Sequence, residues 1–170
     1  MDRARSFYML AALLSGCVGT PYEADAGKPA AREKEASNVA AAKPEFVAVP
    51  TDDRAVDEVV REAKAKADAE QRRLLVYVGA AWCEPCQRFH EAVEAGKLDA
   101  ELANVRFLEF DADVHSPRLI EANYGGKLIP RFAVPGGDGR GTDAKIEGGV
   151  KGEAAVGHIM ARLKDLLAKA

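Results

Sequence analysis

Apolar and polar residues follow two different spacings after residue 51. Val56, Val59 and Val60 recur at helical spacing between charged residues, which predicts a helix from Thr51 to about residue 71. The run LLVYVG, residues 74–79, is nearly continuous in apolar character and ends at glycine. A run of this kind is typical of a strand that is buried on both faces of a sheet.

The remainder of the chain predicts further elements in alternation. They are a helix from Cys83 that ends before Gly96, a strand in VRFLEFDAD (105–113), a short helix over 117–124, hairpin strands in RFAVP (131–135) and AKIEG (144–148), and an amphipathic helix over 153–168. A strand–helix–strand unit implies parallel strands, and a hairpin adds antiparallel ones. The pattern therefore predicts an α/β domain with a central mixed β-sheet flanked by helices.

The first residues have a different pattern. Basic Arg3 and Arg5 precede an apolar run over residues 7–14 that is too short to span a bilayer as a helix. The sequence then reads Leu-Ser-Gly-Cys and ends at Cys17, which resembles the lipobox of bacterial lipoproteins. That resemblance implies a signal peptide over 1–16, a lipid on Cys17 and a location in the bacterial cell envelope. An ordinary secretory signal with a chance cysteine is the alternative.

Residues 17–50 are rich in alanine, charge and proline and poor in large apolar residues. Such a segment buries too little apolar surface to fold alone, so we expect a flexible tether that joins the lipid anchor to a domain over 51–170. The net charge of −3 argues against nucleic acid as a partner. The chain has 3 cysteines, too few for a disulfide-dense secreted scaffold.

Two of these cysteines stand in AAWCEPCQRFH, residues 80–90. Cys83 and Cys86 are three positions apart at the start of a predicted helix, close enough for a disulfide. Pro85 suits the first turn of that helix, where its missing N–H costs nothing. The helix dipole favours a thiolate on Cys83 and should lower its pKa, while Cys86 should be more shielded. The spacing favours a redox pair, in which Cys83 attacks a partner disulfide and Cys86 resolves the mixed disulfide.

Residues 74–134 resemble thioredoxin, through VYVGAAWCEPCQRF and YGGKLIPRF. The resemblance implies a thioredoxin-like fold and a thiol:disulfide oxidoreductase that needs neither a metal nor an organic cofactor. It also implies a cis-proline at Pro130, against the cysteine pair. Trp82, Ile129 and Pro130 would bind the substrate peptide, with Ile129 acting through its main chain.

One position departs from the thioredoxin pattern. Thioredoxins usually carry a buried aspartate six residues before the first cysteine, and this chain has Tyr77 there. We therefore expect Tyr77, Glu84 and Pro85 to tune the redox properties of the cysteine pair. Glu84 and Glu109 are candidates to replace the missing acid, although a solvated edge charge is the simpler interpretation of Glu109.

Metal binding is an alternative function. His90 follows the cysteine pair by one helical turn, and His115 with Asp111 or Asp113 could supply further ligands for zinc or copper. Structural zinc sites usually combine two closely spaced ligand pairs, and this sequence lacks a second pair, so we expect no metal. A non-catalytic peptide-binding module is a third possibility, which the presence of both cysteines disfavours.

The direction of electron flow depends on the dipeptide between the cysteines. Glu84-Pro85 resembles membrane-tethered reductases of the thioredoxin family, whereas oxidising sites more often have histidine there. The sequence thus favours a disulfide reductase that acts on disulfide-containing client proteins. A membrane electron donor would recharge it, and the lipid anchor would hold it at the membrane.

Overall fold

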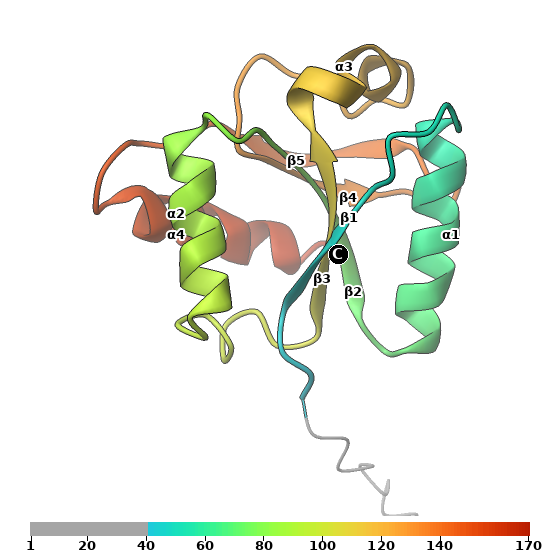
Figure 1. Ribbon diagram of the computed structural model, residues 1–170. Helices are drawn as coiled ribbons and strands as arrows, with labels where there is room; N and C mark the ends of the chain where they lie inside the picture. Colours follow the sequence, from blue (N-terminus) through green and yellow to red (C-terminus); the bar gives the residue numbers. More distant parts are fainter. Residues whose placement is uncertain (1–40) are drawn as a thin grey trace, which may run out of the picture. The chain divides into compact units, whose positions relative to one another are not determined.

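The computed structural model describes residues 41–170, and these residues form a five-stranded sheet with helices on both faces (Figure 1). The elements are β1 (Glu45–Ala48), α1 (Val56–Ala69), β2 (Arg73–Gly79), α2 (Glu84–Glu94), β3 (Val105–Asp111), α3 (Ala112–Glu121), β4 (Arg131–Pro135), β5 (Gly141–Glu147) and α4 (Ala155–Leu167). No helix in residues 41–170 is long and apolar enough to cross a membrane. The predicted signal peptide, Cys17 and most of the predicted tether lie outside the described residues.

The strands stand in the order β1-β3-β2-β4-β5. β1, β3 and β2 are parallel, β4 is antiparallel to β2, and β5 is antiparallel to β4. The helix α2 connects the parallel neighbours β2 and β3, as the strand–helix–strand pattern predicts. The predicted mixed sheet is therefore confirmed.

The central strand β2 is buried on both faces, again as predicted. Leu75 and Tyr77 point to the layer formed by α2 and α4, in a core cluster with the aromatic rings of Phe89, Phe107 and Phe132. The alternate residues of β2 point to a second cluster, which contains side chains of α1 and α3. The sheet is thus covered on both sides, and its core is divided into two layers.

The strand β1 shows that the folded domain begins before Thr51, contrary to the predicted boundary. Glu45 forms an ion pair of 2.6 Å with Arg106 of β3. The ring of Phe46 stacks on those of Phe107 and His90, at centroid distances of 5.0 Å and 3.8 Å. The sequence did not reveal this strand because EFVA is only four residues long and follows an alanine- and proline-rich stretch. The segment available as a tether is correspondingly shorter than 17–50.

Two helix boundaries also differ from the prediction. α1 begins at Val56 rather than near Thr51, because the Arg118 guanidinium donates to the carbonyls of Asp52 and Arg54 and holds that segment out of the helix. α3 begins at Ala112 rather than near residue 117. Its cap is the Asp111 carboxylate, which accepts the main-chain N–H groups of residues 113 and 114 at 2.7 and 3.3 Å.

Candidate active site

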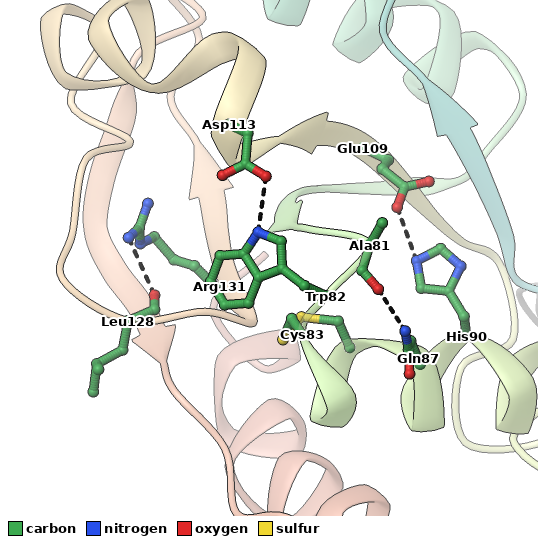
Figure 2. The surroundings of a disulfide bond; sticks show 10 residues. Ala81, Trp82, Cys83, Gln87, His90, Glu109, Asp113, Leu128 and Arg131 are labelled. Atoms are coloured by element: carbon green, nitrogen blue, oxygen red, sulfur yellow. Dashed lines mark hydrogen bonds and ion pairs between the residues drawn. A yellow bond between two sulfur atoms is a disulfide. The ribbon is translucent and has the colours of Figure 1, made fainter.

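A disulfide joins Cys83 and Cys86 at the start of α2 (Figure 2). Their Cα atoms are 5.2 Å apart, within the usual range for a bridge. Cys83 is the N-cap residue, and its carbonyl accepts the main-chain N–H of Gln87 at 3.0 Å. Pro85 lies in the first turn, as predicted. The helix therefore presents its amino-terminal end, with its partial positive charge, to the sulfur of Cys83.

The two cysteines are equally shielded in this disulfide form. Cys83 is 4% exposed and Cys86 is 3% exposed, so the predicted difference in shielding is not seen. What distinguishes them is their surroundings. Cys83 follows the exposed side chain of Trp82, whereas Cys86 lines a cavity on the inner side of the helix.

The peptide bond between Ile129 and Pro130 is cis, as the thioredoxin resemblance implies. Pro130 is buried beside the start of α2. Gly149 lies between these two parts of the site, since a Cβ added there would come within 3.0 Å of Pro85 Cβ and 3.4 Å of Pro130 Cδ. No sequence signal singles out Gly149, yet its lack of a side chain permits this close approach.

An ion pair with buried Arg131 supports the loop before Pro130. The guanidinium of Arg131 donates to the carbonyls of Tyr124 at 2.8 Å and Leu128 at 3.1 Å, and its Nε is 3.5 Å from the Glu147 carboxylate. Glu147 also accepts the main-chain N–H groups of residues 127 and 128. Burial lowers the pKa of Arg131 from its ordinary value. The sequence did not identify this pair, because an arginine that opens a strand normally indicates an exposed edge.

The surface near the disulfide has exposed apolar side chains and free main-chain groups. Trp82 is 67% exposed and Leu128 is 57% exposed. The indole N–H of Trp82 donates to the Asp113 carboxylate at 2.8 Å, which fixes the ring (Figure 2). Within the described residues, no other group pairs with the main-chain N–H or C=O of Ile129. These groups are free to bind an extended peptide.

Glu84 lies on the other side of the cysteine pair from the cavity that Cys86 lines. Its carboxylate accepts Arg88 Nε at 2.9 Å and the main-chain N–H of Gly152 at 3.1 Å. The hydrogen bond from Arg88 is the largest cause of the lowered pKa of Glu84, and the bond from Gly152 adds to it. Glu84 does not line the cavity at Cys86. Its contacts fasten the loop before α4 to the first turn of α2.

The cavity behind Cys86 has a volume of about 430 Å³. Tyr77 lines it and is fully buried, and its hydroxyl has no hydrogen-bond partner in the described residues. Burial, and secondarily the charge of Glu109, raises the pKa of Tyr77. A Cβ at Gly79 would lie 2.6 Å from this hydroxyl, so the glycine makes room for the tyrosine.

Glu109 and His90 also line this cavity. His90 Nε2 is 2.9 Å from Glu109 Oε1, and the two side chains are 25% and 29% exposed (Figure 2). The simpler interpretation of Glu109 from the sequence, a solvated edge charge, is therefore wrong. It pairs with the active-site helix, and the sequence could not show this because the partners belong to different elements.

The other candidate metal ligands have separate structural roles. His115 is a buried residue of α3 and is only 2% exposed. Asp111 caps α3, and Asp113 accepts the indole N–H of Trp82. Among residues 41–170, no group of three or more histidine, cysteine or acidic side chains is arranged to hold a metal ion.

The unpartnered hydroxyl leads to a prediction about stability. Tyr77→Phe should leave the free energy of unfolding unchanged or raise it by about 1 kcal/mol, because it removes a buried polar group that forms no bond. Tyr124→Phe is the matched control, since that buried hydroxyl donates to the Gly139 carbonyl at 2.9 Å and its loss should cost about 1–2 kcal/mol. Urea denaturation measures both values. A larger loss for Tyr77→Phe than for Tyr124→Phe would contradict this account.

Parts of this chain are similar to known proteins. Residues 54–135 match the family model described as thioredoxin-like. No curated protein matches the chain significantly. Similar solved structures include thioredoxin of Trichomonas vaginalis (25% identity, 74% of this chain, 97% of that chain, TM-score 0.44) and oxidised thioredoxin of Plasmodium falciparum (21%, 76%, 97%, 0.44). A third is a mutant thioredoxin of Halobacterium salinarum (20% identity, 75% of this chain, 89% of that chain, TM-score 0.43).

The family model covers both cysteines and the cis-proline, which the structure brings to one end of α2. This agreement between sequence, topology and site geometry is the basis of the assignment. Residues 54–135 therefore belong to a thioredoxin-like domain.

Proposed function

We propose that this protein is a disulfide reductase of the bacterial cell envelope, anchored through a lipid on Cys17. The thioredoxin-like fold and the Cys83–Cys86 pair support thiol:disulfide oxidoreductase activity in general. The observation that carries the proposal is the position of this pair, at the amino-terminal end of α2 and beside Pro130. At this position the helix end stabilises the thiolate of Cys83. The free main-chain groups of Ile129 lie nearby and form a docking edge, to which a client peptide can pair as an added strand.

The reaction starts from the reduced pair. The Cys83 thiolate attacks a client disulfide, forms a mixed disulfide and releases the first client thiol. Cys86 then attacks Cys83 Sγ, which breaks the mixed disulfide and releases the second client thiol. Two electrons pass from the pair to the client, and the protein is left with the Cys83–Cys86 disulfide that the structure contains.

The loop before Pro130 provides the docking edge. The free N–H and C=O groups of Ile129 pair with an extended client segment as an added strand. Trp82 and Leu128 offer exposed apolar surface for its side chains. Arg131 and Glu147 keep the loop in place, so that the client disulfide arrives in line with Cys83.

Two features support the reducing direction and the location. The Glu84-Pro85 dipeptide is similar to that of membrane-tethered reductases, and Glu84 is ionised and tied to Gly152. The basic start, the short apolar run and the lipobox-like sequence before Cys17 support export and lipidation. A membrane electron donor then returns the oxidised pair to the dithiol.

Substitution of either cysteine tests the assignment of roles. Cys83→Ser should abolish reduction of insulin disulfides, because it removes the attacking sulfur. Cys86→Ser should still attack but should accumulate mixed disulfides, which non-reducing gels and mass spectrometry detect. Cys17→Ala in the released protein is the control and should retain full activity. Undiminished insulin reduction by Cys83→Ser would contradict the proposal.

Lipidation is tested separately in a bacterial host. Cys17→Ala should lose incorporation of labelled palmitate and leave the membrane fraction, because the thioether has no acceptor sulfur. Ser15→Ala is the matched control, since it keeps a small residue before the cysteine and should stay membrane-bound. Palmitate labelling of Cys17→Ala equal to that of the unaltered protein would refute the anchor.

A further inference from the structure

We propose that the His90–Glu109 pair accepts the proton that Cys86 must lose before it resolves the mixed disulfide. This inference rests on the proposed function, because it concerns the second step of that reaction. The thiol of Cys86 is a poor nucleophile until it is deprotonated, and it is shielded from bulk water. A group that lines the same cavity as Cys86 can take the proton.

The helix α2 places His90 one turn after Cys86. Residues four apart on a helix lie on the same face, with about 5–6 Å between their Cβ atoms. Helical side chains lean toward the amino terminus of the helix, so His90 leans toward the turn that carries Cys86. Both residues line the same cavity of about 430 Å³. The proton would pass from Cys86 to His90 through water in this cavity.

Glu109 and Phe46 hold the imidazole in its position. Glu109 Oε1 lies 2.9 Å from His90 Nε2, and the ring of Phe46 stacks on the imidazole with a centroid distance of 3.8 Å and an interplanar angle of 12°. Glu109 is the register partner of Tyr77 on the neighbouring strand. A carboxylate thus lies beside the position where the thioredoxin pattern has its buried acid, although Tyr77 itself carries none.

The arrangement places a base near a nucleophilic cysteine. The imidazole of His90 lines the same cavity as Cys86, and the Glu109 carboxylate orients that imidazole and stabilises its charged form. Glu109 is the positioning residue in this constellation. The pair lies on the side of α2 that is opposite to Leu128 and the docking edge, so a bound client does not need to displace it (Figure 2).

The other titratable groups near Cys86 are less suited to this role. Glu84 is bound to Arg88 and Gly152 and does not line the cavity. Tyr77 lines it, but its raised pKa keeps the hydroxyl protonated. Asp111 and His115 also line it, and there the carboxylate caps α3 while His115 Nδ1 lies 3.0 Å from the Asp111 carbonyl.

Resolution of the mixed disulfide conserves protons and electrons. Cys86 Sγ gives its proton to the pair, so that an imidazolium at His90 faces the carboxylate of Glu109 across the 2.9 Å contact. The Cys86 thiolate then attacks Cys83 Sγ, the Cys83–Cys86 bond forms, and the bond to the client sulfur breaks. The departing client thiolate takes a proton from the pair or from water.

The proposal has a defined pH dependence. With the pair in place, the Cys86 thiol has a proton acceptor in the same cavity near neutral pH. Without the pair, Cys86 must ionise unaided, and a free thiol does so near about pH 8.5. Loss of the pair should therefore slow resolution near neutral pH and have little effect at alkaline pH.

Stopped-flow reduction of one equivalent of 5,5′-dithiobis(2-nitrobenzoic acid) by the reduced Cys17→Ala protein separates the two steps, because Cys83 and Cys86 are then its only thiols. The first release of coloured thiolate reports the attack by Cys83, and the second reports resolution by Cys86. His90→Gln and Glu109→Gln should each slow the second phase by roughly tenfold or more near pH 7 and change the first by less than about twofold. The slowed phases should approach the rate of the unaltered protein at alkaline pH.

His158→Gln and Glu91→Gln are matched controls, because both residues are exposed on helices and neither lines the cavity. Both should retain the rates of the unaltered protein. His90→Gln loses the stacking on Phe46 and could unfold for that reason. In that case the isosteric Glu109→Gln provides the test, and near-ultraviolet circular dichroism checks its fold.

The outcomes distinguish this inference from the proposed function. An unchanged second phase in Glu109→Gln, or a slowing that is equal at all pH values, overturns the proton-accepting pair. Absence of the first phase in the unaltered protein would instead overturn the redox function itself. A second phase that is slow only near neutral pH supports the pair.

Discussion

The position of the active site depends on the burial of β2 on both faces. This strand has apolar residues on each side and pairs with β3 and β4, so it is fixed in the centre of the sheet. Gly79 ends it, and the Cys83–Cys86 pair follows after a few residues at the start of α2. The antiparallel neighbour β4 begins just after Pro130. One buried strand therefore brings the helix end and the proline loop to the same edge of the sheet.

Charged groups are placed differently on the two sides of the cysteine pair. On the docking side, buried Arg131 and its partner Glu147 hold the loop that presents Ile129. On the inner side, His90 and Glu109 share a cavity with Cys86. In the proposed mechanism the two sides correspond to the two chemical steps, since a client would meet Cys83 at the docking edge while Cys86 would give its proton to the His90–Glu109 pair.

Apolar periodicity predicted the mixed sheet and its helices, and the spacing of the two cysteines at a helix start predicted the redox pair, because these depend on local signals. The cis-proline followed from the resemblance to thioredoxin. The sequence did not predict β1, whose stability comes from contacts of Phe46 and Glu45 with residues about 60 positions away. It also did not predict the role of Glu109, because the contact of Glu109 with His90 forms only when α2 packs beside β3. Contacts between distant elements leave no periodic pattern in a sequence.

The proposed function requires Cys83 and Cys86 to form a reducing couple. The reduction potential of the cysteine pair tests this, measured by equilibration of the protein with glutathione redox buffers and quantification of its thiols. A reducing couple should have a potential of about −270 mV or below, in the range of thioredoxin. A value near about −120 mV, typical of a strong oxidant, would contradict it.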